Sequence, residues 1–248
     1  MKIVVCIKRV PDTAARIKVT PDGGIDQTGL KYVISPYDEF ALEAALRLRD
    51  GGEGTTVTAL TVGDASAAEQ LRSALAMGAD DAVLIAAETG MDGLATAGVI
   101  ADEITARAPD LVLFGMKAVD GDQQQVGLMA AELAGLPAVS VVAELAIEDG
   151  KAVCHREAEG SVEVLEVPLP AVVTITKGEH EPRYPSLKGI MAAKRKPLEE
   201  KAAEPAAGRI EMRDLAEPPA RPEGRIVGEG ADAVPDLVRL LREEAKVL

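Results

Sequence analysis

The residues best suited to chemistry lie between positions 115 and 127, where the sequence reads GMKAVDGDQQQVG directly after the apolar run 111-LVLF-114. This loop holds two carboxylates, three carboxamides and three glycines. Carboxylates and carboxamides can hold ribose hydroxyls, and glycines let the backbone approach a ligand closely. The helix predicted over 123–135 adds free amides and a positive dipole end at its N-terminus, which together favour phosphate. The loop therefore has the groups that a nucleotide site needs.

The same loop also has a purely structural interpretation. Asp120 and Asp122 could cap the following helix, and Gly121 could make a turn. The loop matches neither the G-x-G-x-x-G dinucleotide motif nor the G-x-x-x-x-G-K-[ST] phosphate-binding motif. Residue types and spacing alone leave nucleotide binding and helix capping as equally good interpretations.

The predicted elements place this loop at one edge of a sheet. Short continuous apolar runs are typical of strands buried on both faces, and they occur at 2–8, 55–63, 82–85, 110–115 and 171–176. Helical patterns alternate with these runs at 35–52, 64–80, 91–107 and 123–135. This order predicts an α/β fold with a doubly wound, mainly parallel sheet. Ligands of such sheets bind at the carboxyl ends of the strands, where the 115–127 loop begins.

The first predicted helix has a clear start. Ser35 can be its N-cap, Pro36 suits the first helical position, and Asp38 falls three residues after the cap. Before it, residues 9–24 contain Pro and Asp-Gly and are predicted as loop and hairpin.

The second half of the chain departs from the strand and helix alternation. Residues 138–167 alternate in polarity around an Asp-Gly turn, which predicts an antiparallel hairpin or meander at the sheet edge. Residues 197–230 are rich in Pro, Ala, Gly and Glu and predict a loose arm. A final helix over 233–248 is expected to pack on the domain or on a partner. We therefore expect an α/β nucleotide-binding domain over 1–196 and an extended C-terminal arm with a terminal helix over 197–248.

Composition disfavours several classes of function. The net charge of −14 argues against free nucleic acid as a partner. Cys6 and Cys154 lie in apolar, strand-like runs and are predicted to be core residues, not a disulfide or redox pair. His155 and His180 have no partner at metal-ligand spacing, so we expect no metal site. The sequence has no run of 18 apolar residues and no signal or transit peptide, which predicts a cytoplasmic protein without membrane insertion.

Two classes of protein that bind adenine nucleotides on an α/β fold fit this sequence poorly. An ATP pyrophosphatase or synthetase needs a Ser-Gly-Gly-x-Asp-Ser type loop after its first strand, and 8-KRVPDTAA-15 is not one. A small ATP-binding stress-response module would be nearer about 150 residues, without the long arm. No general base, metal ligand or cationic clamp is evident around the 115–127 loop, so we predict no catalytic residue.

Several segments, in order along nearly the whole chain, resemble the beta subunit of electron transfer flavoprotein. They read 3-IVVCIKRVPDT-13, 35-SPYDEFALEAALRL-48, 71-LRSALAMGADDAVLI-85, 115-GMKAVDGDQQQVGLMAAEL-133 and 178-GEHEPRYPSLKGIMAAKRKPLE-199. The most specific pieces are ALAMGAD and EPRYPSLKGIMAAKRK. The resemblance implies a sheet of the adenine-nucleotide-binding, alpha-hydrolase-like type.

The resemblance implies an electron carrier and not an enzyme. In this family an alpha subunit carries FAD and accepts electrons from acyl-CoA dehydrogenases or similar enzymes of fatty acid beta-oxidation. A membrane-linked quinone oxidoreductase or another acceptor then receives the electrons. The beta subunit holds a structural AMP. One branch of the family holds a second FAD in the same place and splits electron pairs; the text D-G-D-x-x-Q-V-G resembles that branch, although Gln123 and Gln124 replace its Thr-Ala.

The resemblance also implies which residues contact the nucleotide. By position these are Cys6, Ser35, Pro36, Tyr37, Asp38, Val62, Asp120, Gly121, Asp122, Gln123, Gln124, Gln125, Val126, Gly127, Leu128, Met129, Ala130 and Ala131. Two of them depart from the family, because Ser35 stands where many relatives have Asn and Val62 where some have a polar or sulfur side chain. Tyr37 stands where the family places an aromatic ring near the flavin of the alpha subunit.

Residues 178–196 form the expected partner-docking segment. Positions 181–196 carry five cations against one acid, unlike the rest of the chain. The pattern allows either a surface helix that buries Leu187, Ile190 and Met191 or a flexible arm with an exposed apolar anchor. The resemblance implies the arm, with Leu187 as the anchor for the dehydrogenase. The predicted docking residues are Arg183, Tyr184, Leu187, Ile190 and Met191.

Overall fold

A seven-stranded sheet forms the centre of the protein in the computed structural model, which describes residues 1–87, 90–178, 180–203, 208–221 and 223–248. The strand order is β12-β5-β4-β1-β6-β11-β7, and each neighbouring pair is parallel. The strands are β1 (Lys2–Cys6), β4 (Thr56–Gly63), β5 (Asp81–Ala86), β6 (Leu111–Gly115), β7 (Ala138–Val142), β11 (Ala171–Ile175) and β12 (Leu198–Ala202). The predicted doubly wound α/β fold is confirmed.

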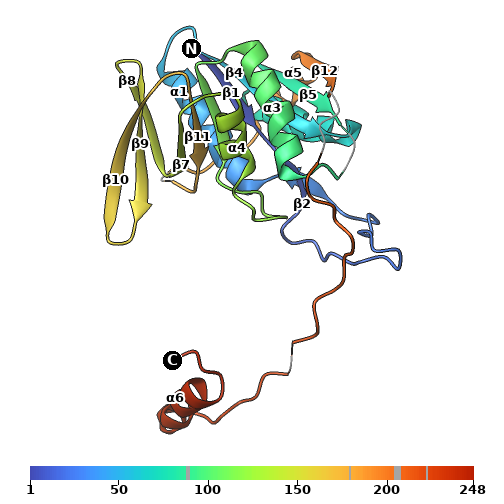
Figure 1. Cartoon of the computed structure of the whole chain (residues 1–248), viewed down its shortest axis with the longest axis vertical. Coiled ribbons are helices and arrows are strands. Elements are labelled where there is room, and N and C mark those ends of the chain that lie inside the picture. The colour runs from blue at the N-terminus through green and yellow to red at the C-terminus, as the bar shows by residue number, and fades with distance from the viewer. Residues whose placement is uncertain (88–89, 179, 204–207, 222) are drawn as a thin grey trace.

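Helices cover both faces of this sheet because its central strands are apolar on both sides. In β1, Ile3 and Val5 face one apolar cluster, and Val4 and Cys6 face the other. The first cluster is covered by α1 (Pro36–Gly51) and α2 (Ala68–Met77), and the second by α3 (Gly93–Arg107) and α4 (Val126–Leu133). Figure 1 shows α3 and α4, in green, side by side in front of the sheet.

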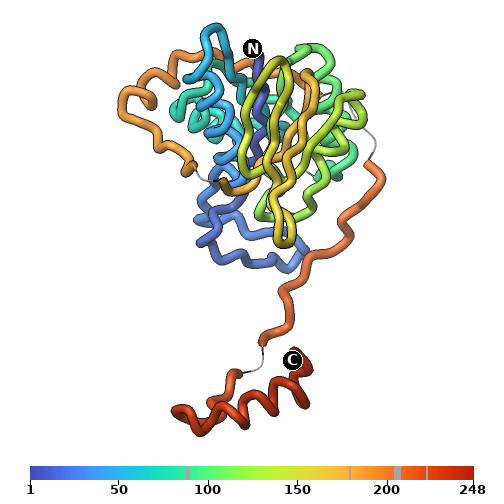
Figure 2. The backbone as a smooth tube through the Cα atoms, turned by 90° about the vertical axis from the view of Figure 1, so that its left-hand side faces the viewer, coloured from blue at the N-terminus to red at the C-terminus, as the bar shows by residue number. Residues whose placement is uncertain are grey.

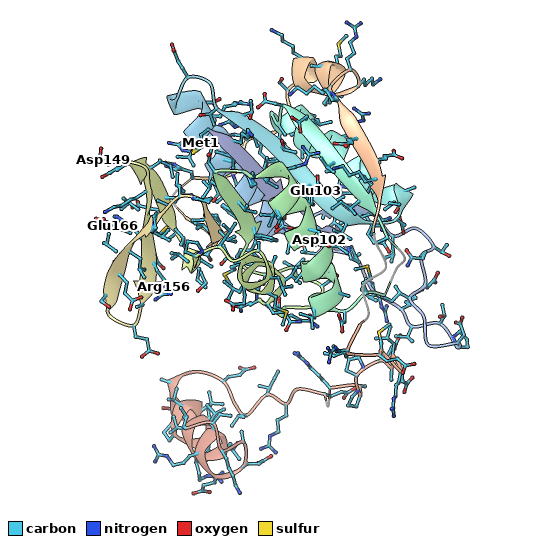
Figure 3. All side chains as sticks on the ribbon, turned by 45° about the horizontal axis from the view of Figure 1, so that its top comes forward. Met1, Asp102, Glu103, Asp149, Arg156 and Glu166 are labelled. Atoms are coloured by element: carbon cyan, nitrogen blue, oxygen red, sulfur yellow. The ribbon has the colours of Figure 1, made fainter. Side chains whose placement is uncertain are left out.

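The predicted antiparallel meander is a sheet of its own. Strands β8 (Glu144–Glu148), β9 (Lys151–Ala158) and β10 (Ser161–Pro168) pair antiparallel, and the predicted Asp-Gly turn joins β8 to β9. Arg156 and Glu166 lie on this small sheet (Figure 3). The segment predicted for the meander began too early. Residues 138–142 form β7, which joins the parallel sheet beside β11 because this apolar stretch finds a buried partner there.

The loose arm predicted from residue 197 begins instead with a strand. Residues Leu198–Ala202 form β12 and pair with β5 at the edge of the sheet. Ion pairs link this strand to α3, because Nζ of Lys201 lies 3.0 Å from Oε1 of the buried Glu103, which also pairs with Arg107. Figure 3 labels Glu103 on α3. An edge strand held by backbone hydrogen bonds and ion pairs needs few apolar residues, so the sequence pattern missed it.

The rest of the C-terminal segment extends away from the sheet. Asp92, the N-cap of α3, accepts hydrogen bonds from the backbone amides of Arg209 and Ile210, which ties the arm to the domain there. Beyond this tie the chain leads to a 3-10 turn, η2 (Ala231–Ala233), and helix α6 (Val234–Glu243) (Figures 1 and 2). Helix α6 has no buried residue, so it does not pack on its own domain.

Four short elements complete the fold. Strands β2 (Arg9–Pro11) and β3 (Tyr32–Ile34) pair antiparallel beyond the end of β1, and a bridge between Val19 and Ile25 closes the loop between them. A 3-10 turn, η1 (Ala65–Ala67), leads into α2, and helix α5 (Leu187–Ala193) lies within the predicted docking segment.

Candidate functional site

The strand order changes direction between β1 and β6. The chain leaves β1 for β4 and β5 on one side, then crosses to β6 on the other side. Cys6 and Phe114 are register partners near the carboxyl ends of these two strands. Ligands of open parallel sheets bind at such a switch point, just beyond the carboxyl ends. The 115–127 loop therefore follows β6 at the place where a ligand is expected.

Asp38 bridges the two strand ends at the switch point. Its Oδ2 accepts a hydrogen bond from the amide of Lys8 at 2.8 Å, and its Oδ1 accepts one from the amide of Gly115 at 3.0 Å. Gly115 has no room for a side chain, because a Cβ there would collide with Oδ1 of Asp38 and with the backbone of Tyr37. The start of α1 is thus held against both strands.

Burial gives Asp38 an unusual acidity. Only 6% of its surface is exposed. Burial raises the pKa of Asp38 to about 7, although the amides of Lys8 and Gly115 and the Lys8 charge favour the ionised form. The position of Ser35 as N-cap and of Pro36 in the first turn is confirmed. However, the Ser35 side chain makes no cap hydrogen bond, and the Asp38 carboxylate is turned to the strand ends.

The two acids of the loop form ion pairs and do not cap the following helix. Lys8 Nζ lies 2.7 Å from Oδ2 of Asp120, and Lys117 Nζ lies 2.9 Å from Oδ2 of Asp122. Helix α4 has Gln125 as its N-cap residue, without a side-chain hydrogen bond. The capping interpretation is therefore wrong. No cationic clamp is evident around the loop in the sequence, but the fold brings Lys8 to it from 112 residues away.

The backbone of the loop is already bent before the helix begins. Asp122 and Gln124 have φ values of 50° and 53°. Residues other than Asn, Asp and Gly seldom adopt this left-handed backbone conformation. These bends delay the helix, so α4 starts at Val126 and not at the predicted residue 123. Gln125 packs against Gly93 at the start of α3 and donates to Gln123 at 2.7 Å. The three carboxamides thus lie in the loop, ahead of the helix amides.

The remaining predicted contacts divide between the loop and the apolar layer. Gly127 lies against the ring of Phe114, where a larger residue would push α4 away from β6. Ser35 is fully buried, and its Oγ has no hydrogen-bond partner in the described part of the chain. One apolar cluster, between the sheet and helices α3 and α4, contains Cys6, Val62, Val126, Met129, Ala130 and Ala131. Leu128 is exposed on the outer side of α4.

Both cysteines are buried and free, as predicted. Burial, reinforced by the charge of Asp38, raises the pKa of Cys6 well above its usual value, so the thiol stays protonated and unreactive. Across the described ranges, no group of three His, Cys, Asp or Glu side chains is placed to hold a metal ion. No helix in the same ranges is long and apolar enough to cross a bilayer.

The groups at the switch point match the chemistry of a nucleoside phosphate. The free amides of the first turn of α4 and the ammonium groups of Lys8 and Lys117 are donors for phosphate oxygens. The carboxylates and carboxamides of the loop can pair with ribose hydroxyls. Lys8 and Lys117 were missed from the sequence, although each stands just after a buried strand, the position from which side chains reach a switch point.

The docking segment contains helix α5, which has an exposed apolar face. Leu187 is 84% exposed, Met191 73% and Ile190 46%, so the alternative that buries these three side chains is wrong. Ser186 caps the helix by accepting the amide of Gly189 at 3.0 Å. A groove of about 710 Å³ runs along the helix and is lined by Leu187, Lys188, Met191, Ala192, Arg195, Lys196 and Pro197.

Arg183, one of the predicted docking residues, already makes contacts within the chain. Its guanidinium forms ion pairs with Glu43 at 2.7 Å and with Asp50 at 2.8 Å, both on α1. Tyr184, by contrast, is 94% exposed next to it. Tyr37, at the start of α1, is half-buried, and Lys117 Nζ lies 5.9 Å from the centre of its ring.

Comparison with known proteins shows the family of the chain. The family described as "Electron transfer flavoprotein domain" matches residues 22–206. Curated proteins named electron transfer flavoprotein subunit beta are similar over the whole chain: that of Syntrophomonas wolfei is 39% identical, with 98% of its length covered, and that of Bacillus subtilis is 41% identical, with 100% covered. "Caffeyl-CoA reductase-Etf complex subunit CarD" of Acetobacterium woodii is 43% identical over 80% of this chain and 77% of its own. The chain therefore belongs to the electron transfer flavoprotein family, as a beta subunit.

Proposed function

We propose that this beta subunit binds AMP at the switch point, pairs with an FAD-carrying alpha subunit, and docks acyl-CoA dehydrogenases through helix α5. The observation that carries the nucleotide proposal is the bridge from Asp38 to Lys8 and Gly115, with Lys8 in turn paired to Asp120. These contacts bring the start of α1, the end of β1 and the 115–127 loop to one place. Side chains from three separate segments converge there as they do in a binding site.

The nucleotide is a structural ligand in this proposal. The amides at the start of α4 and the ammonium groups of Lys8 and Lys117 would hold its phosphate, and the loop side chains would hold its ribose. A ligand that binds only the folded chain stabilises the fold by mass action. The neutral Cys6 and the ion-paired Asp120 and Asp122 offer no nucleophile or free base for phosphate chemistry.

A second FAD in place of AMP is the alternative. The similarity to the CarD subunit supports it, because the name of that protein assigns it to a caffeyl-CoA reductase complex. Whole-chain similarity to several proteins named simply as electron transfer flavoprotein subunits supports AMP. When bound, a flavin would supply electron-transfer chemistry that AMP lacks.

The C-terminal arm and α6 are proposed to contact the alpha subunit. Helix α6 is amphipathic, yet its apolar residues are not buried: Val234 is 52% exposed, and Leu237 and Val238 are partly exposed. An apolar helix face that lies away from its own domain is typical of a subunit interface. The long arm would let the helix reach a neighbouring subunit.

Docking of the dehydrogenase is proposed for the exposed face of α5. Leu187 and Met191 offer apolar contacts, and the cations Lys188 and Arg195 line the same groove. Apolar anchors with charged neighbours are typical of interfaces that select a partner of opposite charge. The partner surface would therefore present an apolar pocket beside carboxylates.

Electron carriage can be tested in the assembled heterodimer. The chain is co-expressed with an alpha subunit, and the flavin absorbance is followed after addition of an acyl-CoA dehydrogenase and its substrate. We expect the flavin absorbance to fall only when the dehydrogenase and its substrate are both present. Hydrolysis of ATP by the purified chain, without flavin reduction, would instead support an enzyme.

A further inference from the structure

Helices α5 and α2 are held together by two cationic side chains, each of which donates hydrogen bonds to carbonyl oxygens at or just beyond the C-terminal end of the other helix. Arg72, on α2, donates from Nη1 to the carbonyl oxygens of Ala193 and Lys196 at 2.7 Å and 2.9 Å. Ala193 is the last residue of α5, where the backbone lacks intrahelical donors, and Lys196 lies in the turn just beyond it. Arg72 therefore satisfies the end of α5 and places positive charge at the negative end of its dipole.

Lys196 makes the same interaction in the opposite direction. Its Nζ donates to the carbonyl oxygens of Leu75, Gly78 and Ala79, at 3.1 Å, 3.3 Å and 2.5 Å. These carbonyls belong to the C-terminal end of α2 and the turn that follows it. An ammonium group has three donors, so Lys196 is fully used inside the protein. Each helix is thus capped by a cation that the other helix or its flank provides.

Gly189 brings the two helices into backbone contact. A Cβ at Gly189 would overlap the carbonyl oxygen of Ala76 in α2. Any side chain at this position would therefore push α5 outward. Ala193, one turn further along α5, is buried in the core cluster. The helix is held in its middle by this close approach and at its end by the caps.

The segment that leads into α5 is clamped as well. Arg183 meets Glu43 through two parallel contacts, Nε to Oε2 at 2.7 Å and Nη2 to Oε1 at 2.9 Å, and its backbone amide donates to Glu43 at 3.1 Å. The Glu43 side chain is buried, so water screens this pair little. Leu187 therefore lies between two fixed points of the chain, the Arg183 clamp and the α2 caps.

We propose that Arg72, Lys196 and Gly189 are positioning residues that hold α5 in its docking conformation before a partner arrives. The inference rests on the proposed docking function of α5. A helix that is already formed needs no ordering when it binds, so the interface keeps more of its binding free energy. Leu187 and Met191 are largely exposed on this fixed helix. Loss of the caps should therefore weaken docking and leave electron transfer within the bound complex unchanged.

The test compares Arg72→Met with Leu187→Ala in the assembled heterodimer. Arg47→Met is the control, because it removes the same charge from an exposed position on α1. Three quantities are measured: hydrogen exchange of the α5 amides, the heterodimer concentration that gives half-maximal dehydrogenase turnover, and the maximal rate. For Arg72→Met we expect α5 exchange to be faster by about tenfold or more, with exchange in β1 unchanged. We expect the half-maximal concentration to rise about fivefold and the maximal rate to stay within about twofold.

The outcomes separate the inference from the function on which it rests. If Leu187→Ala and Arg72→Met both raise the half-maximal concentration, and Arg47→Met does not, the proposal is supported. If Leu187→Ala raises it but Arg72→Met does not, although α5 exchange is faster, preorganisation by the caps is refuted and docking at α5 stands. If Leu187→Ala changes nothing, the docking function itself is wrong, and the inference falls with it. Faster hydrogen exchange throughout the chain in Arg72→Met would show that Arg72 serves general stability only. Gly189→Ala is then the second variant, and it must give faster exchange in α5 alone and a higher half-maximal concentration. If it does not, the proposal is refuted.

Discussion

The Asp38 carboxylate joins the ends of β1 and β6 by accepting one backbone amide from each, at 2.8 Å from Lys8 and 3.0 Å from Gly115. Its pKa is raised to about 7 by burial. One of the groups that join the two strand ends, where the nucleotide is proposed to bind, therefore has a pKa near neutral pH.

The pH dependence of stability follows from this shift. The folded chain binds the Asp38 proton more tightly than the unfolded chain does, since the ordinary value is 3.8 and the folded value is about 7. Its contribution to the free energy of unfolding is therefore greatest below about pH 4 and is lost as the pH rises through 7. In Asp38→Asn this slope should disappear. Urea unfolding of both proteins at pH 5, 6, 7 and 8 measures it, and parallel curves for the two would contradict the assignment.

Gly115 should be intolerant of any side chain. In Gly115→Ala the new Cβ collides with Asp38 and Tyr37, so α1 must move from the strand ends. We expect a loss of about 2 kcal/mol of unfolding free energy, as for other overpacked sites. Gly121→Ala is the control, because a Cβ at Gly121 would lie 3.8 Å from Cγ of Gln123, an ordinary van der Waals distance. This substitution should change the free energy of unfolding by less than about 0.5 kcal/mol. Equal effects of the two substitutions would refute the packing argument.

Lys8 should matter for the nucleotide more than for the fold. Its pair with Asp120 is partly exposed, and exposed pairs contribute little to stability. Lys8→Met removes a charged donor from the proposed phosphate site, so we expect nucleotide release to be roughly tenfold faster. Lys151→Met is the matched control, since Lys151 forms a similar exposed pair with Glu166 on the antiparallel sheet. Retention of the nucleotide after dialysis is measured, and equal retention in both variants would exclude Lys8 from the site.

Leu187 should be dispensable for folding and important for docking. Its side chain is 84% exposed, so Leu187→Ala creates no cavity and should leave the melting temperature unchanged. Loss of the apolar anchor should weaken dehydrogenase coupling by roughly tenfold. The control is Leu133→Ala, the same change at a 53% exposed position at the end of α4. Surface plasmon resonance with the immobilised dehydrogenase would reveal the difference, and similar affinities for both variants would count against α5.

Tyr37 tests the proposed contact with the alpha-subunit flavin. It begins α1 beside the switch point, with Lys117 near its ring. Tyr37→Phe should keep the visible spectrum and reduction potential of the flavin, because the ring remains. Tyr37→Ala should change both, because the flavin would then meet solvent or Lys117. A flavin spectrum that is the same in both variants would place Tyr37 away from the cofactor.

The alternation of strands and helices, and the place of the 115–127 loop directly after β6, could be predicted because they depend on local patterns. Apolar runs such as 2–8 and 110–115 define buried strands, and the loop after β6 follows directly from them. Contacts between distant residues could not be predicted in this way. The pairing of Lys8 with Asp120, and of Arg183 with Glu43, depends on the folded arrangement of segments more than 100 residues apart.

Three further differences have identifiable physical causes. The sequence LEEKA at 198–202 has no apolar run, yet it forms an edge strand through its backbone and the Lys201–Glu103 pair. The start of α4 was placed three residues early because nothing in the run of glutamines shows that Asp122 and Gln124 take left-handed conformations. The docking segment was expected to be flexible, because the caps that fix α5 come from α2, far away in the sequence.

The nucleotide content of the heterodimer tests the central claim most directly. The purified complex is denatured, and the released AMP and FAD are separated and counted by chromatography for the wild type and Lys8→Met. We expect one AMP and one FAD for each wild-type heterodimer, and less AMP with unchanged FAD for Lys8→Met. Two FAD and no AMP would assign a second flavin to the switch point, and one FAD with no other nucleotide would contradict a ligand at this position.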